Sequence, residues 1–210
     1  MAREFSRSIK GSLTEQVFQC LLEDVGYRVI QIGIEESIKE IKAVSESNPN
    51  LYHKTHKGLR TLPDFLVMDE QENSSFLVEI KFRASHEDLP RLICSVKEQV
   101  LHWGDIFLVA FIGNPYHTQK DKKNNIHPDE TPTNYCRVFS LTKDNSGNNF
   151  HVKEYNNQKE KYTGNYISPE KCRWLHGANI QQTFPRLRNA EDLTVAKSVE
   201  IITSMYATFK

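Results

Sequence analysis

The chain has 210 residues, of which 38% are hydrophobic and 26% charged, and this composition predicts one soluble globular domain with a sizeable core. Its formal net charge of zero and pI of about 7.1 argue against binding of polyanions through bulk charge, although a local basic patch can still bind nucleic acid. Apolar runs reach only about eight residues, too short to cross a membrane, and the N-terminal segment lacks an apolar signal region. We therefore expect a cytoplasmic protein without a membrane partner. The four cysteines form no C-x-x-C pair, which argues against a zinc site.

The first predicted elements are a helix over residues 12 to 26, a strand over 27 to 34 and a short helix over 35 to 47. Within the first helix, apolar residues recur at helical spacing: Leu13, Val17, Leu21 and Val25. Ser12 and Glu15 match the S-x-x-E capping box, in which both side chains bond backbone amides at the start of a helix.

The middle of the chain predicts a hairpin, a helix and a buried strand. Apolar strands over 62 to 68 and 76 to 82 are separated by a polar turn, which favours antiparallel pairing. A helix is expected over 88 to 103 from its apolar stripe, with Pro90 tolerated in its first turn. The strand over 106 to 112 is apolar throughout, which is typical of burial on both faces.

The second half of the chain is less regular. Its predicted parts are a polar loop over 113 to 134, a hairpin with strands over 135 to 142 and 150 to 155, a stretch over 156 to 189 without clear signal, and an amphipathic helix over 189 to 209. The element order α-β-(α)-β-β-α-β, followed by the hairpin and helix, predicts an α/β fold with a mixed central sheet flanked by helices. We interpret 1–210 as a single domain, with a core over about 12–112 and a C-terminal elaboration over about 113–210.

Three charged residues interrupt the two strands of the first hairpin. Side chains alternate along a strand, so Glu79 and Lys81 share one face while Ile80 points into the core behind them. If the strands pair, Asp64 lies on the face of Glu79. Two desolvated carboxylates repel each other, and burying them without partners costs several kcal/mol.

A divalent cation would remove this repulsion. Carboxylate oxygens suit Mg²⁺ or Mn²⁺, and the backbone carbonyl of Ile80 is a candidate third ligand beside Asp64 and Glu79. Lys81 would then lie next to a metal-bound water, with its pKa lowered by burial and by the metal, and would orient or deprotonate that water. A water, a base and a Lewis acid together are the requirements of a phosphodiester hydrolase.

The pattern Pro63-Asp64 followed by Glu79-x-Lys81 resembles the PD-(D/E)xK nuclease superfamily, which includes many restriction endonucleases, archaeal Holliday-junction resolvases and RecB-like exonucleases. The resemblance implies a restriction-endonuclease-like core of αβββαβ order, which the predicted elements match over about 12–112. It also implies that Asp64 and Glu79 bind the metal and that Lys81 is the catalytic lysine.

Two further residues match positions of this superfamily. Many members carry a glutamate on the first helix that approaches the metal, and Glu15 matches it, with the capping box as the alternative. RecB-like and lambda-exonuclease-like members carry Q-x-x-x-Y on the helix after the lysine strand, where this chain has Gln99 and, in place of the tyrosine, Trp103. Gln99 would bond the active site or a substrate phosphate; a satisfied core amide is the alternative.

Arg83 and His56 complete the candidate substrate contacts. Arg83 shares, by alternation, the face of Glu79 and Lys81, and either contacts the scissile phosphate or pairs with a carboxylate. His56 lies just upstream of the motif, within reach of phosphate or metal, although a surface histidine without a role is the simpler interpretation.

These residues predict a divalent-metal-dependent nuclease that hydrolyses phosphodiester bonds by attack of water at phosphorus, with Mg²⁺ or Mn²⁺ as cofactor and DNA rather than RNA as partner. Two alternatives stay open. One is a non-catalytic nucleic-acid-binding module on the same fold, and the other is an α/β protein in which the motif is fortuitous and the charges form a buried salt bridge. A homodimer also stays open, because symmetric duplex cutters are often dimers.

Overall fold

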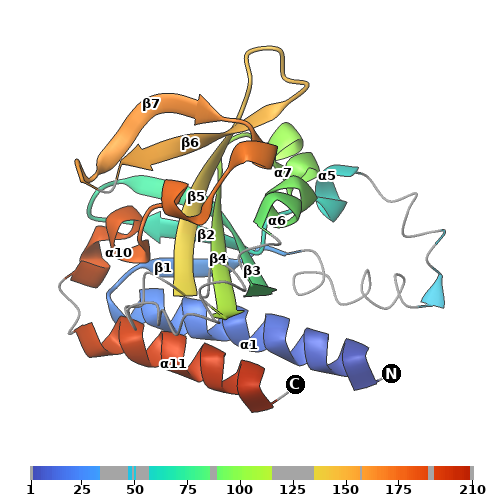
Figure 1. Ribbon diagram of the computed structural model, residues 1–210, viewed down its shortest axis with the longest axis vertical. Coiled ribbons are helices and arrows are strands. Elements are labelled where there is room, and N and C mark those ends of the chain that lie inside the picture. Colours follow the sequence, from blue (N-terminus) through green and yellow to red (C-terminus); the bar gives the residue numbers. More distant parts are fainter. Residues whose placement is uncertain are drawn as a thin grey trace, which may run out of the picture.

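Seven strands form one mixed sheet in the part of the chain that the structure describes (Figure 1). This computed structural model describes residues 2–33, 47–48, 50, 57–85, 89–114, 135–156, 158–188 and 192–208. The strands neighbour one another in chain order: β1 (Arg28–Gln31), β2 (Phe65–Asp69), β3 (Ser74–Ser85), β4 (Ile106–Asn114), β5 (Cys136–Lys143), β6 (Phe150–Asn156) and β7 (Lys161–Ile167). All neighbours are antiparallel except β3 and β4, which are parallel. The expected α/β class with a mixed sheet is therefore confirmed.

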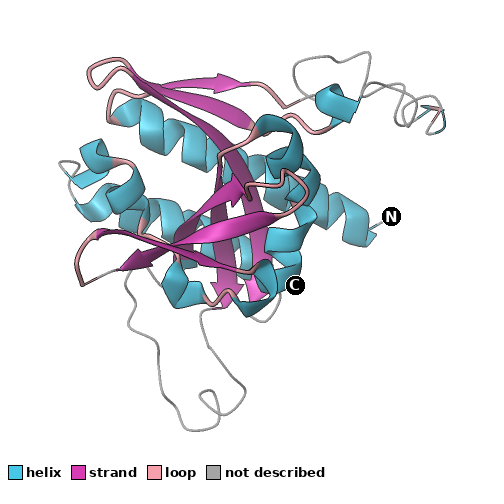
Figure 2. Cartoon of the chain, turned by 90° about the horizontal axis from the view of Figure 1, so that it is seen from above, coloured by secondary structure: helices cyan, strands magenta, loops and turns pink. Residues whose placement is uncertain are grey.

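Helices cover both faces of the sheet (Figure 1, Figure 2). The long helices α1 (Ala2–Asp24) and α11 (Asp192–Thr208) pack side by side beneath one face, and the consecutive helices α6 (Leu89–Ser95) and α7 (Lys97–Trp103) cover the other. The α6–α7 segment is the crossover that a parallel β3–β4 pair requires. The remaining short elements are α5 (Lys57–Arg60), η2 (Pro169–Lys171), η3 (Trp174–His176), α10 (Ile180–Thr183) and η4 (Pro185–Arg188).

Buried apolar side chains form two clusters, one on each face of the sheet. Val78 and Ile80 belong to the cluster between the sheet and helices α1 and α11. Leu77 packs against the cluster between the sheet and helices α6 and α7, which confirms the predicted alternation along β3. Both clusters also contain residues from the second half of the chain, such as Phe184 in the first and Trp174 in the second. Residues of the expected C-terminal elaboration therefore complete the core itself.

The first helix begins ten residues earlier than its apolar stripe predicts. Because α1 runs from Ala2, Ser12 and Glu15 lie in its interior, and Ser12 Oγ accepts a hydrogen bond from Gln16 Nε2 at 3.5 Å. The capping-box interpretation of Ser12 and Glu15 is therefore wrong, since an interior residue has no unpaired first-turn amides to bond. The expected end of the helix is confirmed at Gly26, whose φ is +85°.

Both predicted hairpins are confirmed, as β2–β3 and β5–β6, and so is the C-terminal helix, as α11. The helix expected over 88 to 103 is two helices, broken at Val96 with φ −98° and ψ 9°. Strand β7 lies in a stretch that gave no sequence signal. The short helix expected over 35 to 47 falls almost entirely outside the described residues.

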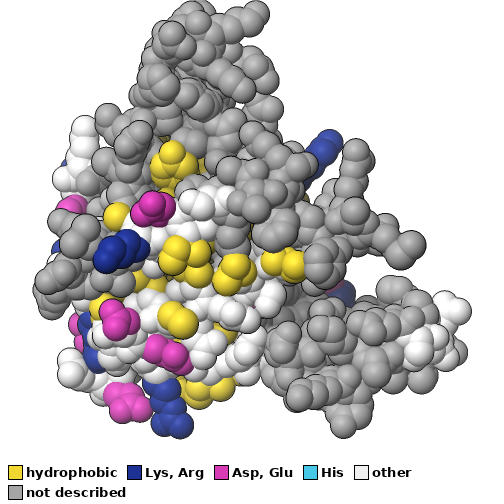
Figure 3. Space-filling view, turned by 90° about the horizontal axis from the view of Figure 1, so that it is seen from below, with side chains coloured by type: hydrophobic (Ala, Val, Ile, Leu, Met, Phe, Trp, Pro, Cys, Tyr) yellow, Lys and Arg dark blue, Asp and Glu magenta, His cyan; other side chains and the backbone are white. Residues whose placement is uncertain are grey.

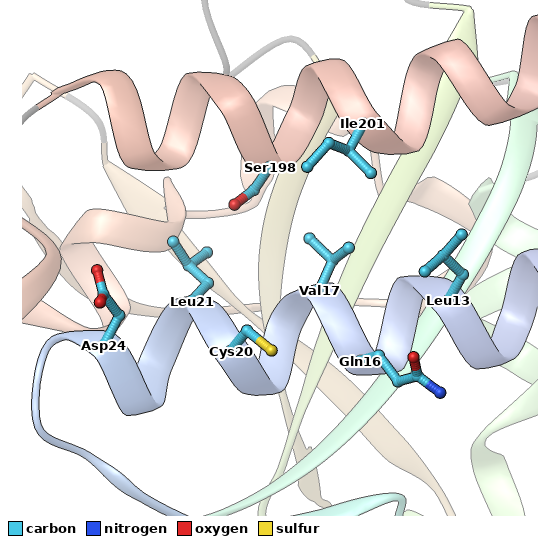
Figure 4. Close-up of a pocket in the computed structure, with 8 residues that line it drawn as sticks. All are labelled: Leu13, Gln16, Val17, Cys20, Leu21, Asp24, Ser198 and Ile201. Atoms are coloured by element: carbon cyan, nitrogen blue, oxygen red, sulfur yellow. The ribbon is translucent and has the colours of Figure 1, made fainter.

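The outer side of α1 and α11 carries a row of exposed apolar side chains (Figure 3). Between the two helices runs an open groove of about 400 Å³ (Figure 4), lined by Leu13, Gln16, Val17, Cys20, Leu21, Asp24, Ser198 and Ile201. Among the described helices, none combines the length and apolar character that crossing a bilayer requires.

Candidate active site between β2 and β3

Asp64 and Glu79 face each other where the β2–β3 pairing ends. The last residue pair between β2 and β3 at this end is Phe65–Val78. From there β3 continues to Ser85 and pairs with β4 alone. Beyond the last pair, side chains replace the missing ladder bonds: Asp64 N donates to Glu79 Oε2 at 3.2 Å, and Ile80 N donates to Asp64 Oδ2 at 2.7 Å. The two acids are therefore held by a reciprocal pair of hydrogen bonds to each other's strand.

The backbone of Asp64 is fixed from the opposite side as well. Its carbonyl oxygen accepts hydrogen bonds from Ile32 N at 2.9 Å and Gly33 N at 3.2 Å, directly after β1. The carboxylate is thus carried by a backbone that is bonded to the segments on both sides of it, which is the rigid support that a precise site needs. These two amides were not among the sequence-based candidates, because nothing in a single sequence indicates which loop amide meets a strand carbonyl.

Glu79 is the best-connected group of the site. Its side chain is only 3% exposed, and its Oε1 forms an ion pair with Lys81 Nζ. Its Oε2 accepts a hydrogen bond from Gln99 Nε2 at 2.8 Å. Gln99 Nε2 also lies 3.4 Å from the carbonyl oxygen of Leu62, whereas its Oε1 is buried without a hydrogen-bond partner among the described residues. The predicted approach of Gln99 to the acids is therefore confirmed, and its bare acceptor oxygen is a place for a donor from outside the described chain.

The electrostatics of the cluster favour an added positive charge. Burial, followed by the charge of Glu79, raises the pKa of Asp64 to about 8; Lys81 opposes this rise and Glu15 adds to it. Burial alone would lower the pKa of Lys81, but the carboxylates of Glu79 and Asp64 outweigh burial and raise it. In the protein by itself the pKa of Lys81 is therefore raised, because two carboxylates surround the ammonium group, and the lowering expected beside a bound metal stays a prediction.

Glu15 contributes its charge to the site from the first helix. It acts electrostatically on both Asp64 and Lys81, raising the pKa of each, so α1 carries this carboxylate toward the two acids as expected. Among the described residues, however, no three His, Cys, Asp or Glu side chains converge closely enough to hold a metal ion by themselves. A cation here would therefore take protein ligands from two carboxylates and from the backbone.

The Ile80 carbonyl suits the role of that backbone ligand. In an extended strand the N–H and C=O of one residue point to the same edge, and Ile80 N–H points to Asp64. The donor set of Asp64, Glu79 and the Ile80 oxygen consists of hard oxygens only, which fits Mg²⁺ or Mn²⁺ with waters completing the coordination.

The contacts of Arg83 and Trp103 are to groups other than the two acids. Arg83 Nη1 donates to the carbonyl oxygen of Phe82 at 2.8 Å, so this guanidinium is bonded along its own strand. Trp103 is 39% exposed, and its ring packs edge-on to His102 with centroids 5.1 Å apart, so it does not join Gln99 at the site. His56 lies outside the described residues.

A scan against protein-family models finds no match for this chain, and searches of curated proteins and of solved structures find none either. The residues and their geometry therefore carry the whole functional argument.

Proposed function

We propose that this protein is a divalent-metal-dependent nuclease, acting most readily on DNA, with a restriction-endonuclease-like core. The observation that carries the proposal is the cluster of Asp64, Glu79 and Lys81 at the point where β3 outruns β2. The element order α1–β1–α5–β2–β3–α6/α7–β4, in which α5 has only four residues, supports the αβββαβ core that this motif implies.

Asp64, Glu79 and the carbonyl of Ile80 would hold Mg²⁺ or Mn²⁺. When bound, such an ion supplies a more acidic water and offsets negative charge at phosphorus. The raised pKa of Asp64 supports the assignment, because a carboxylate that resists ionisation in this setting gains most from a neighbouring cation.

The chain's own groups divide the remaining work. The Lys81 ammonium, paired with Glu79, donates to the attacking water or to a phosphate oxygen and thereby orients it against the phosphorus. Gln99 holds Glu79 through its amide N–H and leaves its oxygen free to accept from that water or from the substrate. Glu15 adds negative charge that strengthens the hold of the site on a cation.

The test is cleavage of linear, circular and branched DNA, and of RNA, in Mg²⁺ and in Mn²⁺. We expect EDTA, Lys81→Ala and Asp64→Asn each to lower the rate by about 10²–10⁴-fold, a range typical of losing a catalytic group. Lys197→Ala, which removes an exposed lysine from α11 on the far side of the sheet, is the matched control and should keep full activity.

A metal titration followed by thermal unfolding separates the alternatives. Stabilisation of the wild type by Mg²⁺ or Mn²⁺, lost in Asp64→Asn but without cleavage of any substrate, would leave the binding module as the better interpretation. Neither cleavage nor stabilisation by a well-folded protein would mean that the cluster is a buried salt bridge, and the proposal would be wrong.

A further inference from the structure

An exposed tyrosine lies beside a half-buried histidine on the outer strands, away from Asp64 and Glu79. Tyr166 on β7 is 59% exposed, and its ring lies 6.0 Å from that of His151 on β6. In the sheet register Tyr166 is opposite Lys153, two residues along β6 from His151, so all three side chains share one face. A large ring this exposed is not part of the core, and it stands beside a lysine on an open surface.

A second aromatic pair lies at the end of α7 and is connected to the first through polar contacts. Asp105 Oδ2 accepts from Lys153 Nζ at 3.2 Å, just after the exposed pair His102 and Trp103. Lys143 Nζ, on β5, lies 3.5 Å from the carbonyl oxygen of His102. We call His102, Trp103, Lys143, His151, Lys153 and Tyr166 the aromatic strip.

We propose that the aromatic strip binds single-stranded nucleic acid. Exposed rings are stacking partners for unpaired bases, and lysines spaced between them meet the phosphates. The groove between α1 and α11 lacks this chemistry, since its lining contains neither an aromatic ring nor a cation.

The strip is independent of the proposed nuclease site. The sheet register links Lys153 to Ser140 and Ser140 to Phe107, and Phe107 packs against the cluster beneath α1 and α11. Tyr166 and Lys153 therefore lie on the face opposite Glu79, while Trp103 stands at the end of the sheet. Trp103 is one helical turn beyond Gln99, about 6 Å along the axis of α7. Trp103 is therefore the member of the strip that lies on the same helix as a residue of the proposed nuclease site.

Binding is measured by fluorescence anisotropy of labelled dT20, rU20 and a DNA duplex, with the full chain in EDTA so that no metal-dependent turnover occurs. We expect both single strands to bind more tightly than the duplex. Tyr166→Ala and Trp103→Ala should each weaken single-strand binding about tenfold, the scale of losing one stacked base. Ile201→Ala is the matched control, because Ile201 is 49% exposed on α11 and should leave the affinity unchanged.

The ion pair inside the strip gives a prediction of opposite sign. Asp105→Asn releases Lys153 from its carboxylate partner, so single strands should bind more tightly and with a steeper salt dependence. Asp24→Asn, which removes one negative charge from the α1–α11 side, should not have this effect.

Tryptophan emission provides a direct readout of the contact. The chain has two tryptophans, and Trp174 is only 4% exposed, so a change of emission on adding dT20 reports Trp103. Trp103→Phe should abolish this change while keeping most of the affinity, because phenylalanine still stacks.

Unchanged affinity in folded Tyr166→Ala and Trp103→Ala would overturn the proposal, as would preference for the duplex. If dT20 and rU20 bind equally, the strip reads stacked bases and phosphates without distinguishing the sugar. Strip-dependent binding by a protein that cleaves nothing would remove the nuclease proposal and leave this one standing. Binding that depends on Lys81 and not on the aromatic strip would overturn the strip proposal and leave the nuclease proposal in place.

Discussion

Asp64 keeps its proton to a higher pH than an exposed aspartate does, because burial and the carboxylate of Glu79 both oppose its ionisation. Its pKa rises from 3.8 to about 8 in the folded protein. Between those values the folded protein binds a proton that the unfolded chain has released. The free energy of unfolding therefore falls as pH rises through this interval, and the loss is complete above about pH 8.

Asp64→Asn should remove this pH dependence. Asparagine can still accept from Ile80 N but carries no charge, so the variant should match the wild type near pH 4 and be several kcal/mol more stable near pH 8.5. Urea unfolding at pH 4 and pH 8.5 in the absence of divalent ions measures this difference in stability, with Asp24→Asn as the control. Parallel pH curves for wild type and Asp64→Asn would contradict the raised pKa.

Gln99 is expected to position Glu79 rather than to support the fold. Gln99→Met keeps the volume but removes the N–H that bonds Glu79 Oε2. We expect the Mg²⁺ concentration that gives half-maximal cleavage to rise about tenfold, in line with the loss of an outer partner of a metal ligand. The Tm should hardly change. Rescue of the rate at high Mg²⁺ would support a positioning role; a large fall in Tm would indicate a structural one.

Strand alternation was enough to predict that Glu79, Lys81 and Asp64 share a face, because that pattern needs only local geometry. The raised pKa of Lys81 in the metal-free protein was not foreseen, because it depends on how close both carboxylates come to one ammonium group. No sequence pattern reports that distance.

At the scale of elements, Gly11 shows why the first helix was misjudged. Its apolar stripe starts at Leu13, and Gly11 followed by Ser12 is typical of a helix start, yet α1 continues back to Ala2. A Cβ added at Gly11 meets no atom within 4 Å. Strand β7 could not be predicted from an apolar pattern either. Its side chains are mostly exposed, so they show no apolar alternation, and the strand is defined by its pairing with β6.

Gly11→Ala should therefore stabilise the protein by about 0.5–1 kcal/mol, because alanine replaces glycine in an open helix interior. The contrasting variant is Gly26→Ala, which should destabilise it, since Gly26 has φ +85° and its Cβ would lie 3.1 Å from Arg186 Nη1. Thermal unfolding of both variants measures the difference. No gain from Gly11→Ala would argue that the helix starts at Ser12 after all.

At the scale of the whole molecule, Arg186 ties the C-terminal segment to the first strands. From η4 it bonds both carboxylate oxygens of Asp69, at the end of β2, and donates from Nη1 to the carbonyl oxygen of Gly26 at 2.7 Å. Its guanidinium also lies 5.1 Å from the ring centroid of Tyr27. This one side chain joins segments about 160 residues apart, which no pattern along the sequence could indicate.

Removing Arg186 alone should lower the free energy of unfolding far more than removing both Arg186 and the charge of Asp69. Burial alone would raise the pKa of Asp69, but hydrogen bonds from Arg186 and nearby amides outweigh it and lower the pKa, so Asp69 stays ionised at neutral pH. Arg186→Met removes the cationic partner of a carboxylate that is only 2% exposed in the wild type, and should destabilise the fold by about 3–5 kcal/mol. The double variant Asp69→Asn with Arg186→Met should recover most of this loss. Because the lowered pKa of Asp69 stabilises the wild type above about pH 4 and less below it, the penalty of Arg186→Met should shrink on acidification. Urea unfolding at pH 7 and pH 3.5 compares the wild type, Asp69→Asn, Arg186→Met and the double variant. If Arg186→Met and the double variant are equally destabilised at pH 7, Arg186 acts through packing alone.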